Sequence, residues 1–252
     1  MEIKNSTVII SGGASGIGAA TARLLSQVGA KVAIFDTNLS LAEKIAAEID
    51  GIAIQCNVTD EKSIAKALQA LFATQGAPRV CINCAGIIQS RRMVNQQGPM
   101  PLTEFRDVIE VNLLGTFNLM RLAAAAMIPL TPLGETQERG VIINTASIAA
   151  FEGQIGQTAY SASKGGIVSL TLPAARELAP FGIRVMTIAP GLVDTPLFDK
   201  LSAKAKEALV AAVPFPKRLA RPEEFARLVV HIVENSMLNG EVIRLDGALR
   251  MS

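Results

Sequence analysis

Short apolar runs, rich in β-branched residues, alternate along the chain with longer stretches whose apolar residues recur at helical spacing. The runs predict strands at Thr7–Ser11, Lys31–Phe35, Ile52–Gln55, Val80–Asn83, Gly140–Thr145, Ile183–Ile188 and Val242–Leu245. The longer stretches predict helices at Ile17–Val28, Leu39–Ile49, Glu61–Thr74, Thr103–Met127, Tyr160–Leu178 and Pro222–Val233. Such alternation is typical of parallel βαβ units, with helices on both faces of one sheet. We therefore predict one α/β domain over residues 1–252, built on a doubly wound parallel sheet of about seven strands.

Two segments depart from the alternation. Gln89–Pro101 contains Gly98-Pro99-Met100-Pro101 and is predicted to be a loop. The segment 192–216 mixes apolar residues with lysines, which predicts a lid-like helical excursion over a site.

Two of the predicted helices, Thr103–Met127 and the helix that contains Tyr160, carry apolar residues on more than one face. A helix that is apolar all round is buried on both sides, and a sheet covers only one of them. We therefore expect a homodimer or homotetramer assembled on these helices.

Composition narrows the possible partners. Half of the residues are hydrophobic, 18% are charged, and the net charge is +2 without a basic run. Neither nucleic acid nor a membrane is an expected partner. The longest apolar helical stretch, Leu122–Leu130, is too short to span a bilayer, and the N-terminus does not resemble a signal or transit segment. We expect a cytoplasmic protein.

The three cysteines do not predict a metal site. Cys81 and Cys84 have the spacing of a metal-binding pair, but on a strand these positions face opposite sides. The sequence lacks a second Cys/His pair that would complete a zinc site. We expect buried, reduced thiols and no metal.

The first strand is followed by a glycine-rich turn, Ser11–Gly18. Its glycines allow close approach to a pyrophosphate, and the next helix offers free N–H groups at its positive end. Asp36 stands 18 residues after Gly18, where a carboxylate accepts hydrogen bonds from the adenosine ribose and repels a 2′-phosphate. The pattern favours NAD over NADP. The alternative is an ordinary βα turn, with Asp36 as a solvated helix-cap residue.

Tyr160 is the only tyrosine in the chain and lies four residues before Lys164. On a helix these positions share one face, and a nearby ammonium favours phenolate over phenol and lowers the tyrosine pKa. The pair is a candidate acid/base near neutral pH. Taken alone, it more often represents a surface ring beside a solvated lysine.

Several motifs, in order, resemble the short-chain dehydrogenase/reductase family over essentially the whole chain. Gly12, Gly16 and Gly18 match the family's cofactor fingerprint. Asn83-Cys84-Ala85-Gly86 matches its Asn-Asn-Ala-Gly element, with Cys84 in place of the second Asn. The resemblance implies a Rossmann-type fold, NAD as cofactor, and binding by Gly12, Ser15, Gly16, Ile17, Gly18, Asp36, Asn57, Val58, Asn83, Ala85, Gly86, Tyr160, Lys164, Pro190, Gly191, Val193 and Thr195.

One departure concerns the adenine site. The family usually has Asp-Val after the third strand, whereas this chain has Asn57-Val58. The amide oxygen of Asn57 can accept a hydrogen bond from the adenine amino group, but without charge.

The family's catalytic positions are filled by Asn112, Ser147, Tyr160 and Lys164. By resemblance, Tyr160 is the base in alcohol oxidation and the acid in ketone reduction, and Lys164 lowers its pKa and binds the nicotinamide ribose. Ser147 hydrogen-bonds the substrate oxygen, and the backbone of Asn112 holds a water that links Lys164 to solvent. An ordinary loop serine and a tolerated helix asparagine are the alternatives.

Long strings in the C-terminal half resemble the branch of type-2 3-hydroxyacyl-CoA dehydrogenases. That likeness implies NAD-dependent interconversion of 3-hydroxyacyl-CoA and 3-oxoacyl-CoA in fatty acid metabolism, by a homotetramer. The alternatives are an NAD-dependent dehydrogenase of a hydroxysteroid or another apolar secondary alcohol, and a cofactor-binding scaffold without turnover. Candidate substrate contacts are Gln154 and Gln157 and an apolar set that equally fits lid packing: Leu192, Leu197, Phe198, Leu201 and Phe215.

Overall fold

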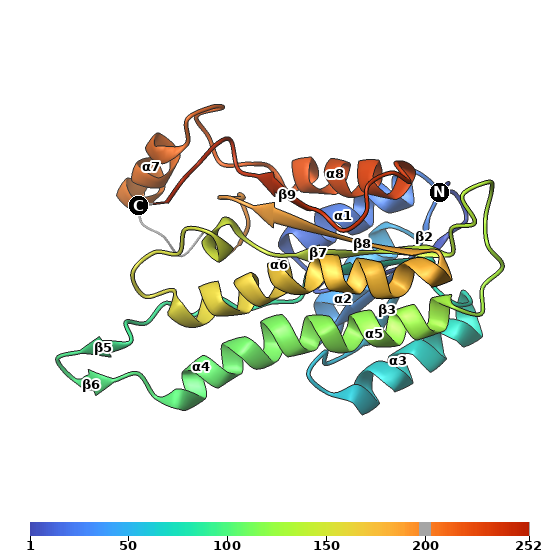
Figure 1. Cartoon of the computed structure of the whole chain (residues 1–252), viewed down its shortest axis with the longest axis horizontal. Helices are drawn as coiled ribbons and strands as arrows, with labels where there is room; N and C mark the ends of the chain where they lie inside the picture. The colour runs from blue at the N-terminus through green and yellow to red at the C-terminus, as the bar shows by residue number, and fades with distance from the viewer. Residues whose placement is uncertain (197–202, 252) are drawn as a thin grey trace.

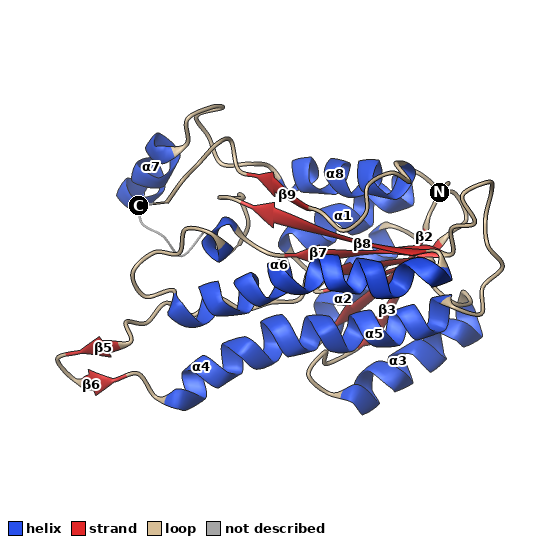
Figure 2. Ribbon diagram, in the orientation of Figure 1, coloured by secondary structure: helices blue, strands red, loops and turns tan. Residues whose placement is uncertain are grey.

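The computed structural model describes residues 1–196 and 203–251. Seven parallel strands form one sheet in the order β3-β2-β1-β4-β7-β8-β9 (Figures 1 and 2). The predicted doubly wound α/β sheet is thereby confirmed. The strands are β1 (Thr7–Ser11), β2 (Lys31–Asp36), β3 (Ile52–Gln55), β4 (Val80–Asn83), β7 (Gly140–Thr145), β8 (Ile183–Pro190) and β9 (Val242–Leu245).

Helices cover both faces of this sheet. One face packs against α1 (Gly16–Gln27), α2 (Leu39–Glu48) and α8 (Pro222–Glu234). The other packs against α3 (Glu61–Thr74), α5 (Gly115–Met127) and α6 (Thr158–Leu178), with α4 (Leu102–Ile109) beside α6 (Figure 1). Two short 3₁₀ turns, η2 (Ile148–Ala150) and η3 (Ala179–Phe181), flank α6.

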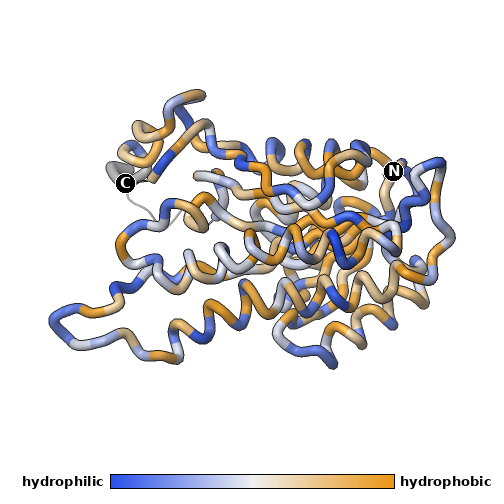
Figure 3. Tube along the Cα trace, viewed as in Figure 1, coloured by the Kyte–Doolittle hydropathy of each residue, from blue (hydrophilic) through white to orange (hydrophobic). Residues whose placement is uncertain are grey.

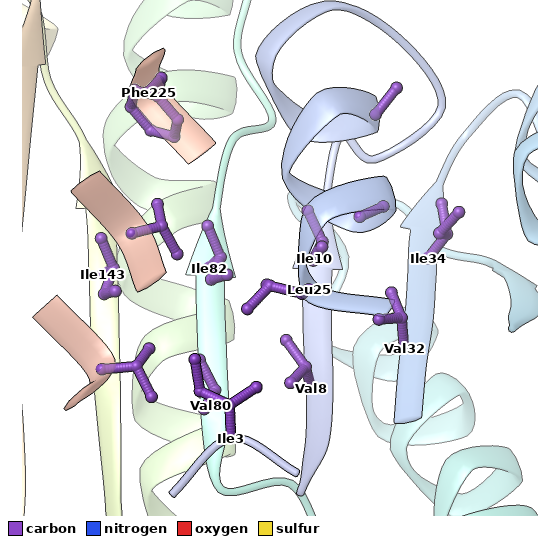
Figure 4. Packing of buried hydrophobic residues seen from close by; sticks show 14 of the residues in the cluster. Ile3, Val8, Ile10, Leu25, Val32, Ile34, Val80, Ile82, Ile143 and Phe225 are labelled. Carbon is purple, nitrogen blue, oxygen red and sulfur yellow. The ribbon is translucent and has the colours of Figure 1, made fainter. Parts of the chain in front are cut away.

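Side chains along the central strands alternate between the two helical layers. Val8 and Ile10 of β1 belong to the cluster under α1 and α8, which Figure 4 shows, whereas Ile9 packs under α3 and α5. Because both faces are covered, these strands are mainly apolar, as the hydropathy colouring of Figure 3 shows.

The order of the strands creates a crevice beside β1. β2 and β3 lie on one side of β1 and β4 lies on the other, so the loops after β1 and β4 diverge at the carboxyl edge of the sheet. At their start the two loops still lie close together: a Cβ atom on Gly12, whose φ is +66°, would lie only 2.7 Å from the Ala85 nitrogen.

The predicted helix Thr103–Met127 is continuous but not regular throughout. A π-helical turn, Glu110–Leu114, separates α4 from α5. The combined run Leu102–Met127 is also long and apolar enough to cross a bilayer by composition, unlike the shorter stretch that the sequence suggested. In the fold it is a core helix, packed beside α6 and α3 (Figure 1).

The two irregular segments are partly ordered. The predicted loop Gln89–Pro101 contains a small antiparallel hairpin of β5 (Val94–Asn95) and β6 (Gly98–Pro99). The predicted excursion 192–216 contains α7 (Ala203–Ala212). Leu197, Phe198 and Leu201, three of the predicted substrate contacts, lie outside the described residues.

Candidate active site

A cavity of about 850 Å³ lies at the carboxyl edge of the sheet, over the crevice between β1 and β4. It extends from the residues after β2 and β3 to the residues after β7 and the start of α6. Most of the predicted site residues line it: Gly12, Ser15, Gly16, Ile17, Gly18, Asp36, Asn57, Val58, Ala85, Gly86, Ser147, Gln157, Tyr160, Lys164, Pro190, Gly191, Leu192, Val193 and Thr195.

The glycine-rich turn forms a close cradle at the start of α1. A Cβ atom on Gly18 would clash with the carbonyl oxygen of Gly12, so the turn can close only around glycine. Across the turn, a Cβ atom on Gly16 would touch the Thr195 side chain, 3.4 Å away. Backbone N–H groups at a helix start, approachable through glycine, fit the pyrophosphate of a dinucleotide.

Asp36, at the end of β2, is held in place by backbone N–H groups. One carboxylate oxygen accepts a hydrogen bond from Ala14 of the glycine-rich turn at 3.1 Å, and the other accepts from Asn38 at 2.9 Å. The carboxylate is thereby fixed in the cavity wall, next to the start of α1.

Asn57 is oriented differently from the sequence prediction. Its amide oxygen accepts hydrogen bonds from both the backbone N–H and the hydroxyl of Thr59, at 3.1 and 2.9 Å. Both lone pairs of that oxygen are therefore engaged, and the adenine amino group is not its partner in this geometry. The amide that remains available to the cavity is a donor.

Three predicted catalytic side chains meet at the other end of the cavity. Tyr160 and Lys164 lie one turn apart in α6, with the ammonium 5.8 Å from the centroid of the ring. Ser147 begins η2 directly after β7, and its hydroxyl accepts a hydrogen bond from Ala149 at 3.1 Å. The Lys164 ammonium donates to the Thr145 carbonyl at 2.7 Å, which fixes it beneath the cavity.

Burial controls the titration of this group. Tyr160 is 9% exposed, and its burial raises the pKa of the phenol; the hydrogen bond with Ser147 offsets only part of that rise. Burial also lowers the pKa of Lys164, to about 8. The predicted lowering of the Tyr160 pKa is therefore wrong for the protein alone, because loss of solvent outweighs the hydrogen bond with Ser147.

Asn112 lies behind the cavity rather than in its lining. It is fully buried in the π turn, where its side chain accepts from the Ile87 N–H at 2.8 Å and donates to the Ile87 carbonyl at 2.9 Å. It also donates to Ser163 at 3.1 Å, and Ser163 donates to the Tyr160 carbonyl. Asn112 thus joins the loop after β4 to the helix that carries Tyr160.

Three further predicted residues lie outside the cavity lining. Asn83 is buried and donates to Asn144 on the neighbouring strand at 2.8 Å. Gln154 is exposed, and its backbone N–H donates to the side chain of Gln157. Phe215 is 81% exposed, so its predicted place in an acyl slot is wrong for this geometry.

The cavity is also lined by residues that were not among the predicted site residues: Phe35, Thr37, Cys56, Cys84, Ile87, Ile88, Val111, Thr145, Ala146, Ile148, Ala149, Pro196 and Met251. Most flank a predicted residue and follow the end of a strand, a signal that was available. Met251 has no such signal, because it reaches the cavity through a turn after β9.

The cysteines are free, as expected, and Cys81 and Cys84 point to opposite layers of the core. Burial raises the pKa of Cys84 to about 11, which leaves it a protonated thiol near neutral pH. Within residues 1–196 and 203–251, His, Cys, Asp and Glu side chains form no group that could hold a metal ion.

Comparison with known proteins decides the family. Residues 6–206 match the short chain dehydrogenase family. The chain belongs to the short-chain dehydrogenase/reductase family. It is therefore an oxidoreductase of a family whose members typically use a nicotinamide cofactor.

Individual members of this family are similar over the whole chain. The chain is 50% identical to 3-hydroxyacyl-CoA dehydrogenase type-2 of Rattus norvegicus, over 99% of this chain and 97% of the relative. It is 46% identical to the protein of that name in Drosophila melanogaster, over 99% of both chains. The crystal structure of 3-hydroxyacyl-CoA dehydrogenase type-2 from Mycobacterium avium superposes with a TM-score of 0.93 at 40% identity, covering 100% of this chain and 99% of that one.

Proposed function

We propose that this short-chain dehydrogenase is an NAD-dependent enzyme that interconverts a 3-hydroxyacyl-CoA and the corresponding 3-oxoacyl-CoA. The observation that carries the proposal is one continuous cavity with Asp36 and the glycine-rich turn at one end and Ser147, Tyr160 and Lys164 at the other. Relatives named 3-hydroxyacyl-CoA dehydrogenase type-2, at 46–51% identity over nearly the whole chain, support the substrate class.

The dinucleotide would be held by the cradle of the glycine-rich turn and by Asp36. The N–H groups that begin α1 would hold its pyrophosphate, and Lys164 would hold the ribose next to the nicotinamide. When bound, the cofactor supplies the hydride acceptor or donor. Thr195, opposite Gly16, would contact the cofactor as well.

The side chains of this protein handle the proton. In the oxidation direction, the Tyr160 oxygen takes the proton of the substrate hydroxyl while hydride leaves the carbon that carries this hydroxyl for the cofactor. In the reduction direction, the Tyr160 phenol returns the proton to the substrate oxygen. Ser147 donates a hydrogen bond to the substrate oxygen and stabilises the charge that develops there. The positive charge of Lys164 favours the phenolate form of Tyr160.

A specificity measurement tests this function. We expect NAD-dependent turnover of 3-hydroxybutyryl-CoA with a kcat/KM far above that for a hydroxysteroid. The variant Tyr160→Phe should lose about 10²–10⁴-fold in turnover or more, with its cofactor affinity retained. Negligible turnover of every acyl-CoA, together with turnover of a steroid or another apolar alcohol, would reject the substrate class. Full cellular function of Tyr160→Phe would instead indicate a scaffold.

Asp36 carries the preference for NAD within this proposal. Its fixed carboxylate accepts hydrogen bonds from ribose hydroxyls and repels a 2′-phosphate, so NADH should bind at least about tenfold more tightly than NADPH. The variant Asp36→Asn keeps an oxygen that can accept a hydrogen bond from Ala14 but removes the charge. It should therefore narrow the difference in affinity between NADH and NADPH. Fluorescence titration of both cofactors measures it, and equal affinities for the unmodified protein would contradict the assignment.

A further inference from the structure

The segment after β9 bends at Gly247 and Ala248 and reaches the cavity wall at Met251. Gly247 and Ala248 both have left-handed backbone conformations, with φ of +60° and +65°. An alanine rarely adopts this conformation, so its surroundings must impose it. The Ala248 N–H donates to the Asp246 carboxylate at 2.9 Å, and a Cβ atom on Gly247 would lie 2.8 Å from Val213. The turn is therefore closed by local contacts on both sides.

Arg244 joins this segment to the loop that leads into the catalytic helix. Its guanidinium donates two hydrogen bonds to Glu152, at 2.7 and 2.8 Å, and its Nε donates to Asp246 at 2.7 Å. It also donates to the Leu249 carbonyl at 3.0 Å and lies 5.0 Å from the centroid of the Phe151 ring. The partly buried side chain of Arg244 thus connects the loop before α6 to the segment that follows β9.

The Glu152 loop is itself fixed against the catalytic helix. A Cβ atom on Gly153 would clash with the buried hydroxyl of Ser161, the residue that follows Tyr160 in α6. The loop therefore packs tightly on the first turn of α6. Glu152, the residue before Gly153, forms the hydrogen bonds with Arg244.

These contacts place Met251 in the cavity wall near Tyr160. Met251 is half-buried and lines the cavity together with Tyr160, Gln157 and Leu192. It packs against two separate apolar clusters, one that contains Tyr160 and one that contains Val213. A flexible thioether between these clusters occupies the space into which an apolar substrate would extend beyond its reacting carbon.

We propose that Met251 determines which acyl chains the enzyme accepts, as a wall of the substrate end of the cavity, and that Arg244 is the positioning residue that holds it there. This inference rests on the proposed function for the nature of the substrate. The wall itself is a property of the cavity and applies to any apolar secondary alcohol that Tyr160 deprotonates.

The wall is tested with a series of straight-chain 3-hydroxyacyl-CoA substrates. The measured quantity is kcat/KM for a long chain divided by kcat/KM for the four-carbon chain. In Met251→Ala this ratio should rise at least about tenfold, since one methylene of difference in an apolar pocket is worth roughly 10–200-fold. Met251→Leu, of similar volume, is the matched control and should keep the ratio within about threefold. An unchanged ratio in Met251→Ala would overturn the proposal.

The role of Arg244 is tested by a double-mutant cycle. Arg244→Lys keeps the charge but loses the paired hydrogen bonds to Glu152, so the chain-length ratio should shift in the same direction as in Met251→Ala. In the Met251→Ala background, Arg244→Lys should shift the ratio much less, because the two residues act through one wall. A lowered melting temperature with an unchanged ratio would show a structural role only, and it would overturn the positioning role.

A second substrate series separates this inference from the proposed function. If the unmodified enzyme oxidises straight-chain secondary alcohols but no acyl-CoA, the proposed function fails. The same length ratio, measured on the alcohols, then decides the role of Met251. If the enzyme turns over acyl-CoA but Met251→Ala leaves the chain-length ratio unchanged, the role of Met251 is rejected and the proposed function stands.

Discussion

Tyr160 and Lys164 show how far two residues can be understood from their spacing. The spacing correctly predicted that the ring and the ammonium would share a helix face, and they lie 5.8 Å apart. It did not reveal that both would be buried, because burial arises from β7, η2 and the loop after β4. That burial reverses the expected direction of the Tyr160 pKa shift in the protein alone. In the proposed function, the cationic ring of bound NAD would favour phenolate in addition to Lys164.

This reasoning gives a direct spectroscopic prediction. Tyr160 is the only tyrosine and the chain lacks tryptophan, so phenolate absorbance in the near ultraviolet reports this group alone. We expect its pKa above the ordinary value of 10 without cofactor and a lower value with NAD, because the nicotinamide ring is cationic. NADH should not produce that fall. A pKa below 10 without cofactor would contradict the burial argument, and Tyr160→Phe gives the blank titration.

Lys164 predicts a dependence of stability on pH. Its folded pKa of about 8 lies below the ordinary 10.5, so between these values the unfolded chain binds the proton that the folded chain has lost. Stability attributable to this group therefore rises with pH from 8 to 10.5, by at most about 1.4 kcal/mol per pH unit. Below pH 8 both states are protonated and the contribution is constant. Denaturant unfolding of Lys164→Met should show a flatter pH dependence in this window than the unmodified protein, and an identical slope would contradict the buried lysine.

At the scale of elements, periodicity predicted what local sequence determines. All seven sheet strands fall where β-branched runs placed them, and the helices begin and end within a few residues of the prediction. The π turn at Glu110–Leu114 was missed because tertiary contacts define it: Asn112 hydrogen-bonds the backbone of Ile87, which lies 25 residues away. The hairpin of β5 and β6 was missed because strands of two residues carry no periodicity.

The turn between β1 and α1 gives a prediction for an element. Gly18→Ala would drive a methyl group into the Gly12 carbonyl and open the cradle, so cofactor affinity should fall at least tenfold, with about 1–3 kcal/mol lost in stability. Gly76→Ala is the matched control. It strains a left-handed residue, φ +82°, in open space, and should cost about 1–2 kcal/mol without changing cofactor affinity. Calorimetric titration with NADH and thermal unfolding distinguish the two, and full affinity in Gly18→Ala would contradict the cradle.

At the scale of the whole molecule, the fold and the position of the cavity could be predicted from the sequence. Strand–helix alternation determines the sheet, and the crevice beside β1 follows from its strand order. The contribution of Met251 could not be predicted, because the turn at Gly247 and Ala248 brings it back from the far end of the chain. The apolar surface on the π turn, α5 and α6 fits the expected oligomer: Leu114, Phe117 and Leu172 are 49%, 49% and 44% exposed.

The proposed assembly on these helices has its own test. Phe117→Glu places a charge on the exposed apolar face of α5, and burying an unpaired charge at a subunit contact is costly. Sedimentation should show a smaller species for this variant than for the unmodified protein. Leu41→Glu on α2, where the leucine is 41% exposed on the opposite helical layer, should leave the assembly unchanged. A monomeric unmodified protein would remove the basis for this proposal.

The strand order also has a consequence for synthesis on the ribosome. β1 emerges first, β2 and β3 then add successively on one side of it, and β4, β7, β8 and β9 add in turn on the other. Each strand that follows β1 in the described seven-stranded sheet therefore joins an edge that is already present, and none of them has to insert between two paired neighbours. The nascent chain can extend its sheet outward in the order in which it is translated, with the cofactor crevice defined as soon as β4 has docked.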